Sequence, residues 1–183
     1  MTCVSALIKD GIGYMASDSC ASQGSHEKTV KNKKVFNING VLMGLCGSWR
    51  CINIIANSLI IDDFNIEQSS HKFAFKLANR LMDLMEDFRS ASKHEDVLEM
   101  DAEVLLIYKD DIIKIGSDFC YVIYTDNYAA IGSGSDHAEG VLSGTAYTPE
   151  NLVKKSVKAS AKHNAGVDSE VVVITNNPDE VSS

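Results

Sequence analysis

Residues 2–18 read TCVSALIKDGIGYMASD, and this stretch decides the fold that we predict for the chain. Two apolar runs, CVSALI at 3–8 and IGYMAS at 12–17, flank a turn at Lys9-Asp10-Gly11. Glycine in such a turn readily adopts positive φ, so the stretch predicts a β-hairpin. A second hairpin is predicted for residues 35–38 and 41–46, because Asn39-Gly40 between them is the strongest short turn signal.

Helices and further strands follow these hairpins along the chain. Apolar residues spaced by three and four predict a helix of about a dozen residues after Ser48, and a second helix with Ser69 or Ser70 as N-cap. Strands are predicted next, then a short helix from Asp136 and a helix that begins at Thr148-Pro149. The predicted strands of the second half are residues 104–108, 112–115, 121–124, 129–131 and 171–175.

The order of these elements predicts the fold class. Strands are followed by two helices, further strands, two more helices and a last strand. Runs such as VLLIY and EVVVI are apolar on both faces, which is typical of sheets covered on both sides. We therefore predict an α+β protein in which two sheets pack face to face between outer helix layers, a four-layer αββα sandwich. The length of 183 residues fits a single domain over residues 1–183.

Composition excludes several classes of function. The formal net charge of −8 disfavours a nucleic-acid-binding or anionic-membrane surface. No apolar run reaches the length of a membrane span, and the N-terminus lacks the basic region of a signal peptide. We expect a cytoplasmic protein. The acidic stretch 83–103 is interpreted as a solvated helix end plus loop, with partner docking as the alternative.

The cysteines and histidines show neither the spacing of a metal site nor the pattern of a disulfide framework. The five cysteines contain no C-x-x-C pair, and we interpret them as small buried residues in a reducing compartment. The five histidines lack ligand spacing, so neither a metal site nor another cofactor is expected.

Thr2 is the residue that suggests catalysis. It follows Met1, and processing commonly removes a methionine before a small residue. The new N-terminus would carry a hydroxyl nucleophile and, in its own α-amine, a base of pKa about 7.7–8.0. Asp18 and Lys34 follow sixteen and thirty-two residues later. Taken singly, Asp18 is also compatible with a turn cap and Lys34 with a solvated surface charge.

The chain resembles the proteasome β-subunit and HslV-like family of N-terminal-nucleophile hydrolases. The resemblance covers nearly the whole chain, and it implies the αββα fold and a threonine peptidase. It rests on five stretches in order: Thr2, Ala16-Ser17-Asp18-Ser19 with Ser22-Gln23-Gly24, VKNKKV at 30–35, Gly44-Leu45-Cys46-Gly47-Ser48, and AIGSG at 130–134.

The resemblance implies a role for each matched residue. Thr2 would attack a peptide carbonyl, Lys34 would lower the pKa of the Thr2 amine, and Asp18 would hold Lys34. Gly47, between a strand and a helix, would offer its N–H to the oxyanion, and Ser133 would orient the amine and its water. Cys3 is the alternative nucleophile, but the spacing matches the family only when it is counted from Thr2. A serine triad of Ser133, Asp136 and His137 is disfavoured because such close neighbours rarely converge on one proton.

The same resemblance implies a substrate pocket and partners. Ala21, Asn32, Leu45 and Trp49 would line the pocket, with Trp49 narrowing it for small or medium apolar side chains. Cys20 replaces the arginine that is common in proteasome subunits, and Asp168 and Ser169 are candidates to complete the site. The family implies a homo-oligomeric ring or barrel, an ATP-dependent unfoldase and an unfolded polypeptide substrate.

Two other functions stay open at this point. One is an N-terminal-nucleophile amidase that cuts a small amide. The other is a catalytically inactive, proteasome-like scaffold or assembly protein. With Met1 attached, the nitrogen of Thr2 is an amide and not a base, so activity depends on the removal of Met1.

Overall fold

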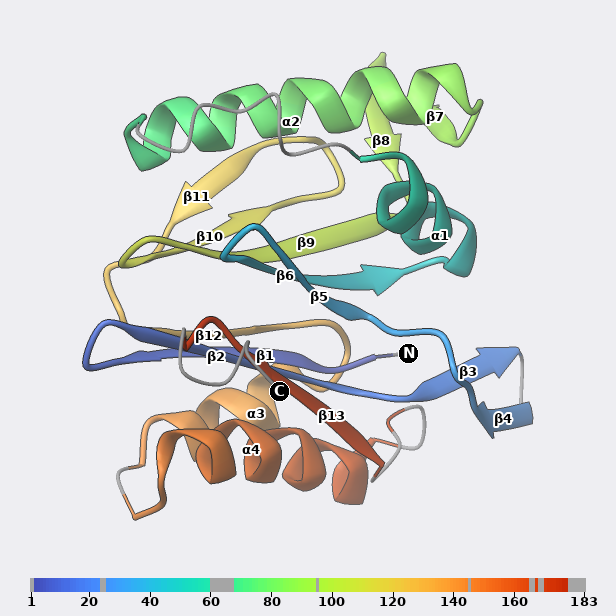
Figure 1. The fold of residues 1–183 in the computed structure, drawn as a ribbon. Helices are drawn as coiled ribbons and strands as arrows, with labels where there is room; N and C mark the ends of the chain where they lie inside the picture. Colours follow the sequence, from blue (N-terminus) through green and yellow to red (C-terminus); the bar gives the residue numbers. More distant parts are fainter. Residues whose placement is uncertain are drawn as a thin grey trace.

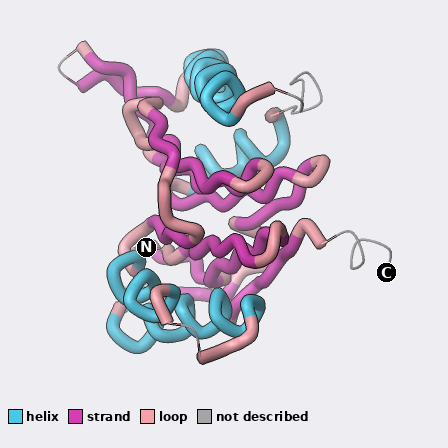
Figure 2. Tube along the Cα trace, turned by 90° about the vertical axis from the view of Figure 1, so that its left-hand side faces the viewer, coloured by secondary structure: helices cyan, strands magenta, loops and turns pink. Residues whose placement is uncertain are grey.

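Two β-sheets face each other between two layers of helices in the computed structural model, which describes residues 2–23, 26–59, 68–94, 96–144, 146–164, 167 and 170–177 (Figure 1). From top to bottom in that view lie α1 and α2, the first sheet, the second sheet, and α3 with α4. The side view shows the same order, with strands between helices (Figure 2). The predicted αββα sandwich is confirmed.

The lower sheet has four strands in the order β12-β1-β2-β13. Its strands are β12 (Tyr128–Ile131), β1 (Val4–Lys9), β2 (Ile12–Asp18) and β13 (Val171–Thr175). The predicted turn between β1 and β2 is present, with φ of 52° at Asp10 and 75° at Gly11. All three pairs in this sheet are antiparallel, so the start of β1 lies beside the ends of β2 and β12.

The upper sheet has five strands in the order β11-β10-β9-β6-β5. Its strands are β11 (Tyr121–Ile123), β10 (Asp111–Ile115), β9 (Ala102–Tyr108), β6 (Val41–Gly47) and β5 (Val35–Ile38). The predicted Asn39-Gly40 turn joins β5 to β6 with positive φ at both residues, 53° and 85°. These are the backbone angles that an Asn-Gly hairpin turn requires.

The four helices in the described part of the chain lie where the sequence predicts them. They are α1 (Trp49–Ser58), α2 (Ser70–Asp87), α3 (Ser135–Leu142) and α4 (Pro149–His163). Ser48 caps α1 by accepting a hydrogen bond from the N–H of Cys51, and Ser69 caps α2 in the same way. No helix among the described residues is long and apolar enough to cross a membrane.

Three apolar layers fill the sandwich, and β1 shows how one strand serves two of them. Val4 and Ala6 point between the sheets, whereas Cys3 and Leu7 point toward α3 and α4. The third layer lies between the upper sheet and helices α1 and α2, where Phe73 and Leu77 are fully buried. Strands buried on both faces account for the continuous apolar runs in the sequence.

Two short hairpins were missed by the sequence interpretation. β3 (Cys20–Gln23) pairs with β4 (His26–Thr29) in the polar segment after β2. β7 (Ala91–His94) pairs with β8 (Val97–Met100), so the acidic stretch 83–103 is a helix end followed by a hairpin and the start of β9, and the predicted loop is wrong. Both hairpins consist of four-residue strands, and none of these strands shows the alternation of apolar and polar residues that identifies a strand from sequence.

One buried hydroxyl in the lower sheet offers a test of the packing. Ser17 on β2 is 0% exposed, and its Oγ has no hydrogen-bond partner among the described residues. A buried hydroxyl without a partner costs about 1–3 kcal/mol, so Ser17→Ala is expected to raise the free energy of unfolding by about 1 kcal/mol. Urea denaturation measures the change. Ser5→Ala is the matched control, because Ser5 Oγ donates to Val153 O and accepts from Ser156 Oγ, and its loss should destabilise the protein.

Candidate functional site

The antiparallel order of the strands brings the predicted catalytic residues to one edge of the sandwich. Thr2 precedes β1, Asp18 ends β2, and Ser133 follows β12, so these three lie together at one end of the lower sheet. Lys34 and Gly47 reach the same edge from the upper sheet. Lys34 O accepts a hydrogen bond from the N–H of Leu45 at 2.8 Å, which fixes it beside the end of β6.

A hydrogen-bonded line connects Thr2, Lys34 and Asp18. Lys34 Nζ donates to Thr2 Oγ1 at 2.9 Å and to Asp18 Oδ2 at 2.9 Å. The three residues are 5%, 1% and 1% exposed. The ammonium therefore contacts the hydroxyl that would become the nucleophile, and the carboxylate holds the ammonium in place.

Asp18 is anchored by the backbone as well as by Lys34. Its Oδ1 accepts from the N–H of Cys3 at 2.9 Å, and its Oδ2 accepts from the N–H of Cys20 at 3.0 Å. These contacts link the residue before β1 and the first residue of β3 to the end of β2. Cys20 thus contributes its backbone N–H, while its side chain is buried in the core.

The absence of a side chain at Gly132 leaves room for the carbonyl group of Thr2. Its φ is 89°, and a Cβ built on it would lie 2.3 Å from the carbonyl oxygen of Thr2. Only glycine fits such a close approach with this backbone angle. The Thr2 carbonyl also accepts two long hydrogen bonds at 3.4 Å, from the N–H of Gly134 and from Ser133 Oγ. The loop after β12 therefore fixes the backbone of Thr2.

Gly47 is held in a similar way on the opposite side of the site. Its φ is 121°, and a Cβ there would lie 2.3 Å from the carbonyl oxygen of Asp101. The N–H of the next residue, Ser48, donates to that same oxygen at 2.7 Å. Gly47 is exposed, which leaves its backbone accessible from the cavity described next.

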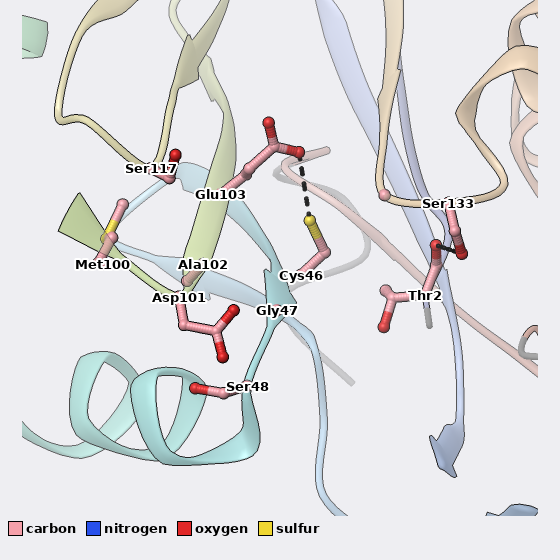
Figure 3. Close-up of a pocket in the computed structure, with 11 residues that line it drawn as sticks. Thr2, Cys46, Gly47, Ser48, Met100, Asp101, Ala102, Glu103, Ser117 and Ser133 are labelled. Atoms are coloured by element: carbon pink, nitrogen blue, oxygen red, sulfur yellow. Dashed lines mark hydrogen bonds between the residues drawn. The ribbon is translucent and has the colours of Figure 1, made fainter. Parts of the chain in front are cut away.

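Thr2 and Gly47 line one cavity of about 470 Å³ (Figure 3). Figure 3 shows Thr2 and Ser133 on one wall, with Gly47 and the start of β9 on the other. A peptide carbonyl in this space would have a hydroxyl on one side and the backbone of Gly47 on the other. The lining residues are Thr2, Cys46, Gly47, Ser48, Met100, Asp101, Ala102, Glu103, Ser117, Gly132 and Ser133.

Comparison with known proteins identifies the fold. The chain is 23% identical over 171 residues to the ATP-dependent protease subunit HslV of Lactiplantibacillus plantarum, which covers 90% of this chain and 88% of that protein. The structure matches Thiobacillus denitrificans BPH with a TM-score of 0.81 at 20% identity, over 95% of this chain and 97% of that one. The chain has the HslV-like fold of the N-terminal-nucleophile hydrolases.

A second solved structure agrees with the HslV-like fold. The eukaryotic HslV of Trypanosoma brucei matches with a TM-score of 0.71 and 18% identity, over 95% of this chain and 98% of that one. No family model matches the chain. The fold implied by the resemblance is confirmed, and the curated relative is described as a protease subunit.

The four predicted substrate residues lie apart from the cavity within this HslV-like fold. Leu45 is fully buried in the layer between the upper sheet and its helices. The Trp49 ring lies 5.6 Å from Lys34 Nζ, a distance at which a cation–π contact forms. Asn32 is exposed and donates to Asn53 Oδ1 at 3.4 Å, and Ala21 is half-buried on β3. None of the four lines the cavity that contains Thr2.

The rival nucleophiles are poorly placed. Burial raises the pKa of the Cys3 thiol to about 11, so this side chain stays protonated near neutral pH. The His137 ring packs against that of His163 with centroids 4.8 Å apart and planes tilted by 36°, while Ser133 Oγ donates to the Thr2 carbonyl. Met1, Asp168 and Ser169 lie outside the described residues. Among the described residues, no group of three His, Cys, Asp or Glu side chains could hold a metal ion.

The sequence interpretation missed the wall formed by β9. Asp101 and Glu103 line the cavity, and Glu103 Oε1 pairs with Lys114 Nζ at 2.6 Å. Cys46 Sγ donates to Glu103 Oε2 at 3.6 Å, and burial, together with that carboxylate, raises the pKa of Cys46 to about 12. Nothing in the sequence marks these residues, because they come from a segment more than fifty residues beyond β6.

Proposed function

We propose that the chain is a threonine-type endopeptidase subunit in which Thr2, after the removal of Met1, attacks peptide bonds. The observation that carries the proposal is the buried line from Thr2 Oγ1 through Lys34 Nζ to Asp18, which opens on a cavity. A buried ion pair in contact with a hydroxyl is more than packing requires, since such a pair adds little net stability.

The proposed reaction proceeds in two steps. In the first, the free α-amine of Thr2 takes the proton of Oγ1, and the oxygen attacks the carbonyl carbon of the substrate. Lys34 Nζ, already hydrogen-bonded to Oγ1, stabilises the developing negative charge on it, and the N–H of Gly47 stabilises the oxyanion. The α-ammonium then protonates the departing amine, which leaves an ester on Thr2.

The second step restores the enzyme. Water loses a proton to the α-amine and attacks the ester carbonyl, and Thr2 Oγ1 departs and regains the proton. Asp18 has no covalent part in either step. It keeps Lys34 in place, and the backbone contacts from Gly132, Ser133 and Gly134 keep Thr2 aligned.

The assembly and partners are part of the same proposal. The HslV relative is described as a subunit of an ATP-dependent protease. We infer a homo-oligomeric ring or barrel in the cytoplasm, in which Thr2 faces an enclosed chamber. An ATP-dependent unfoldase would deliver unfolded polypeptide to that chamber, and no cofactor or metal is needed for the reaction.

Trapping Thr2 tests the proposal. One Thiobacillus denitrificans BPH structure holds epoxomicin, and its electrophilic epoxide makes this compound a probe for an activated threonine. Intact mass of the purified protein should show the loss of Met1 and, after incubation, the addition of one epoxomicin. Peptide mapping should place the adduct on Thr2, and Thr2→Ala should carry none.

Two outcomes would favour the rival functions. Native protein that retains Met1, forms no adduct and cleaves no peptide would support the inactive scaffold. A free Thr2 that forms the adduct in a particle too small for a ring, and that cleaves small amides but no peptide, would support the amidase.

A further inference from the structure

The cavity beside Thr2 has an acidic wall. Asp101, directly before β9, and Glu103 on β9 both line it, and none of the described residues that line it is a lysine or an arginine. Figure 3 shows this wall facing Thr2 across the open space. Any side chain that enters the cavity next to the nucleophile therefore meets carboxylates.

The two carboxylates differ in how far they are already neutralised. Glu103 is bound by Lys114 and by the thiol of Cys46, which occupy both of its oxygens. The ion pairs in the described part of the chain are Lys34–Asp18 and Lys114–Glu103, and neither involves Asp101. Asp101 is exposed and lines the cavity, and no described lysine, arginine or histidine forms an ion pair with its carboxylate.

The backbone fixes Asp101 close to the expected position of the scissile bond. The carbonyl of Asp101 accepts the N–H of Ser48 and packs against Gly47 so closely that a Cβ on Gly47 would clash with it. Gly47 is the residue that we propose as oxyanion donor. The backbone of Asp101 thus lies against Gly47, and Asp101 lines the same cavity as Thr2.

We propose that this cavity binds a lysine or arginine side chain flanking the scissile bond, with Asp101 as the residue that determines this specificity. The inference rests on the proposed peptidase function. Asp101 supplies the charge, and the hydroxyls of Ser48, Ser117 and Ser133 supply further acceptors for N–H groups. The volume of about 470 Å³ falls in the range of ligand pockets, roughly 300–1,000 Å³.

This inference differs from the small or medium apolar preference expected from the sequence. That expectation placed the pocket at Leu45 and Trp49, whereas Leu45 is buried in the core and Trp49 lies against the Lys34 ammonium. An acidic wall also disfavours substrates with Asp or Glu at the same position, because like charges repel at short range.

Peptide series that differ at one position test the inference. Internally quenched peptides with Arg, norleucine or Glu on either side of the scissile bond are incubated with the protein that lacks Met1, and mass spectrometry identifies the bond cut. We expect kcat/KM for Arg to exceed that for norleucine by about tenfold, and Glu to be the poorest, in line with a charge-assisted hydrogen bond. Asp101→Asn should reduce the Arg-to-norleucine ratio about tenfold.

Two further variants sharpen the result. Asp101→Lys should reverse the preference from Arg to Glu. Asp83→Asn makes the same change of charge on the exposed surface of α2, and its Arg-to-norleucine ratio should stay at the wild-type value. The effect of Asp101 should also weaken at high salt, since an exposed charge is screened.

The failure of the inference can be distinguished from that of the proposed function. Equal hydrolysis of Arg and norleucine peptides, abolished by Thr2→Ala, would overturn the inference and leave the peptidase intact. Absence of all turnover would overturn the peptidase. In that case, calorimetry with the Thr2→Ala protein and the same peptides still tests the inference. Tighter binding of the Arg peptide that depends on Asp101 supports the inference, and equal binding of the Arg and norleucine peptides refutes it.

Discussion

Replacing Thr2 with alanine is expected to lower kcat/KM for peptide hydrolysis by about 10⁴-fold or more, which is the scale of loss when a covalent nucleophile is removed. Thr2 Oγ1 is the oxygen that Lys34 Nζ contacts at 2.9 Å, and no other hydroxyl in the cavity has a described ammonium partner. The measurement is single-turnover hydrolysis of an internally quenched peptide by protein whose mass confirms the loss of Met1.

Thr2→Ser is the matched control for this prediction. It keeps the hydroxyl and the α-amine and removes only the γ-methyl, so activity within about tenfold of the wild type is expected. The alanine variant should still fold, because Lys34 keeps its contact with Asp18 and the loss of one hydrogen bond costs about 1–2 kcal/mol. Hydrolysis at the wild-type rate by a folded Thr2→Ala protein would refute the assignment of Thr2 as nucleophile.

Local sequence signals predicted the elements that hold the site. The Asp10-Gly11 and Asn39-Gly40 turns set the two hairpins, and the N-caps Ser48 and Ser69 set the starts of α1 and α2. These signals depend on a few neighbouring residues, so they can be identified without tertiary contacts. The family resemblance predicted that Thr2, Asp18 and Lys34 lie together. In the structure, hydrogen bonds connect the three residues in one line.

Features that depend on tertiary contacts could not be predicted. Asp101 enters the site because β9 pairs with β6, and a pairing across more than fifty residues leaves no local pattern. The contact between the Trp49 ring and Lys34 Nζ likewise joins the start of α1 to the residue before β5. The strands of the hairpins β3–β4 and β7–β8 do not alternate between apolar and polar residues, so hydrophobic periodicity gave no sign of them.

Variants of the Asp18–Lys34 pair allow its contribution to stability to be measured separately from its contribution to catalysis. Asp18→Asn is expected to lower the free energy of unfolding by about 3–5 kcal/mol, because it leaves the Lys34 ammonium 1% exposed without a counter-charge. Lys34→Met should cost less, about 2–3 kcal/mol, since the Asp18 carboxylate keeps the N–H groups of Cys3 and Cys20. Urea denaturation gives each value, with an unchanged m-value as evidence that unfolding stays two-state.

The double variant Asp18→Asn, Lys34→Met then shows whether the pair serves catalysis or folding alone. With both charges removed, no buried ion is left unpaired, so its loss of stability should be smaller than the sum of the two single losses by at least about 2 kcal/mol. Its peptidase activity should nevertheless be as low as that of Lys34→Met, because the ammonium that contacts Thr2 Oγ1 is missing. Additive losses of stability would mean that the two charges act independently, and an active double variant would mean that the pair serves folding alone. A stable and inactive protein is the result that a catalytic pair requires, since the removal of both buried charges leaves no unpaired ion to destabilise the fold.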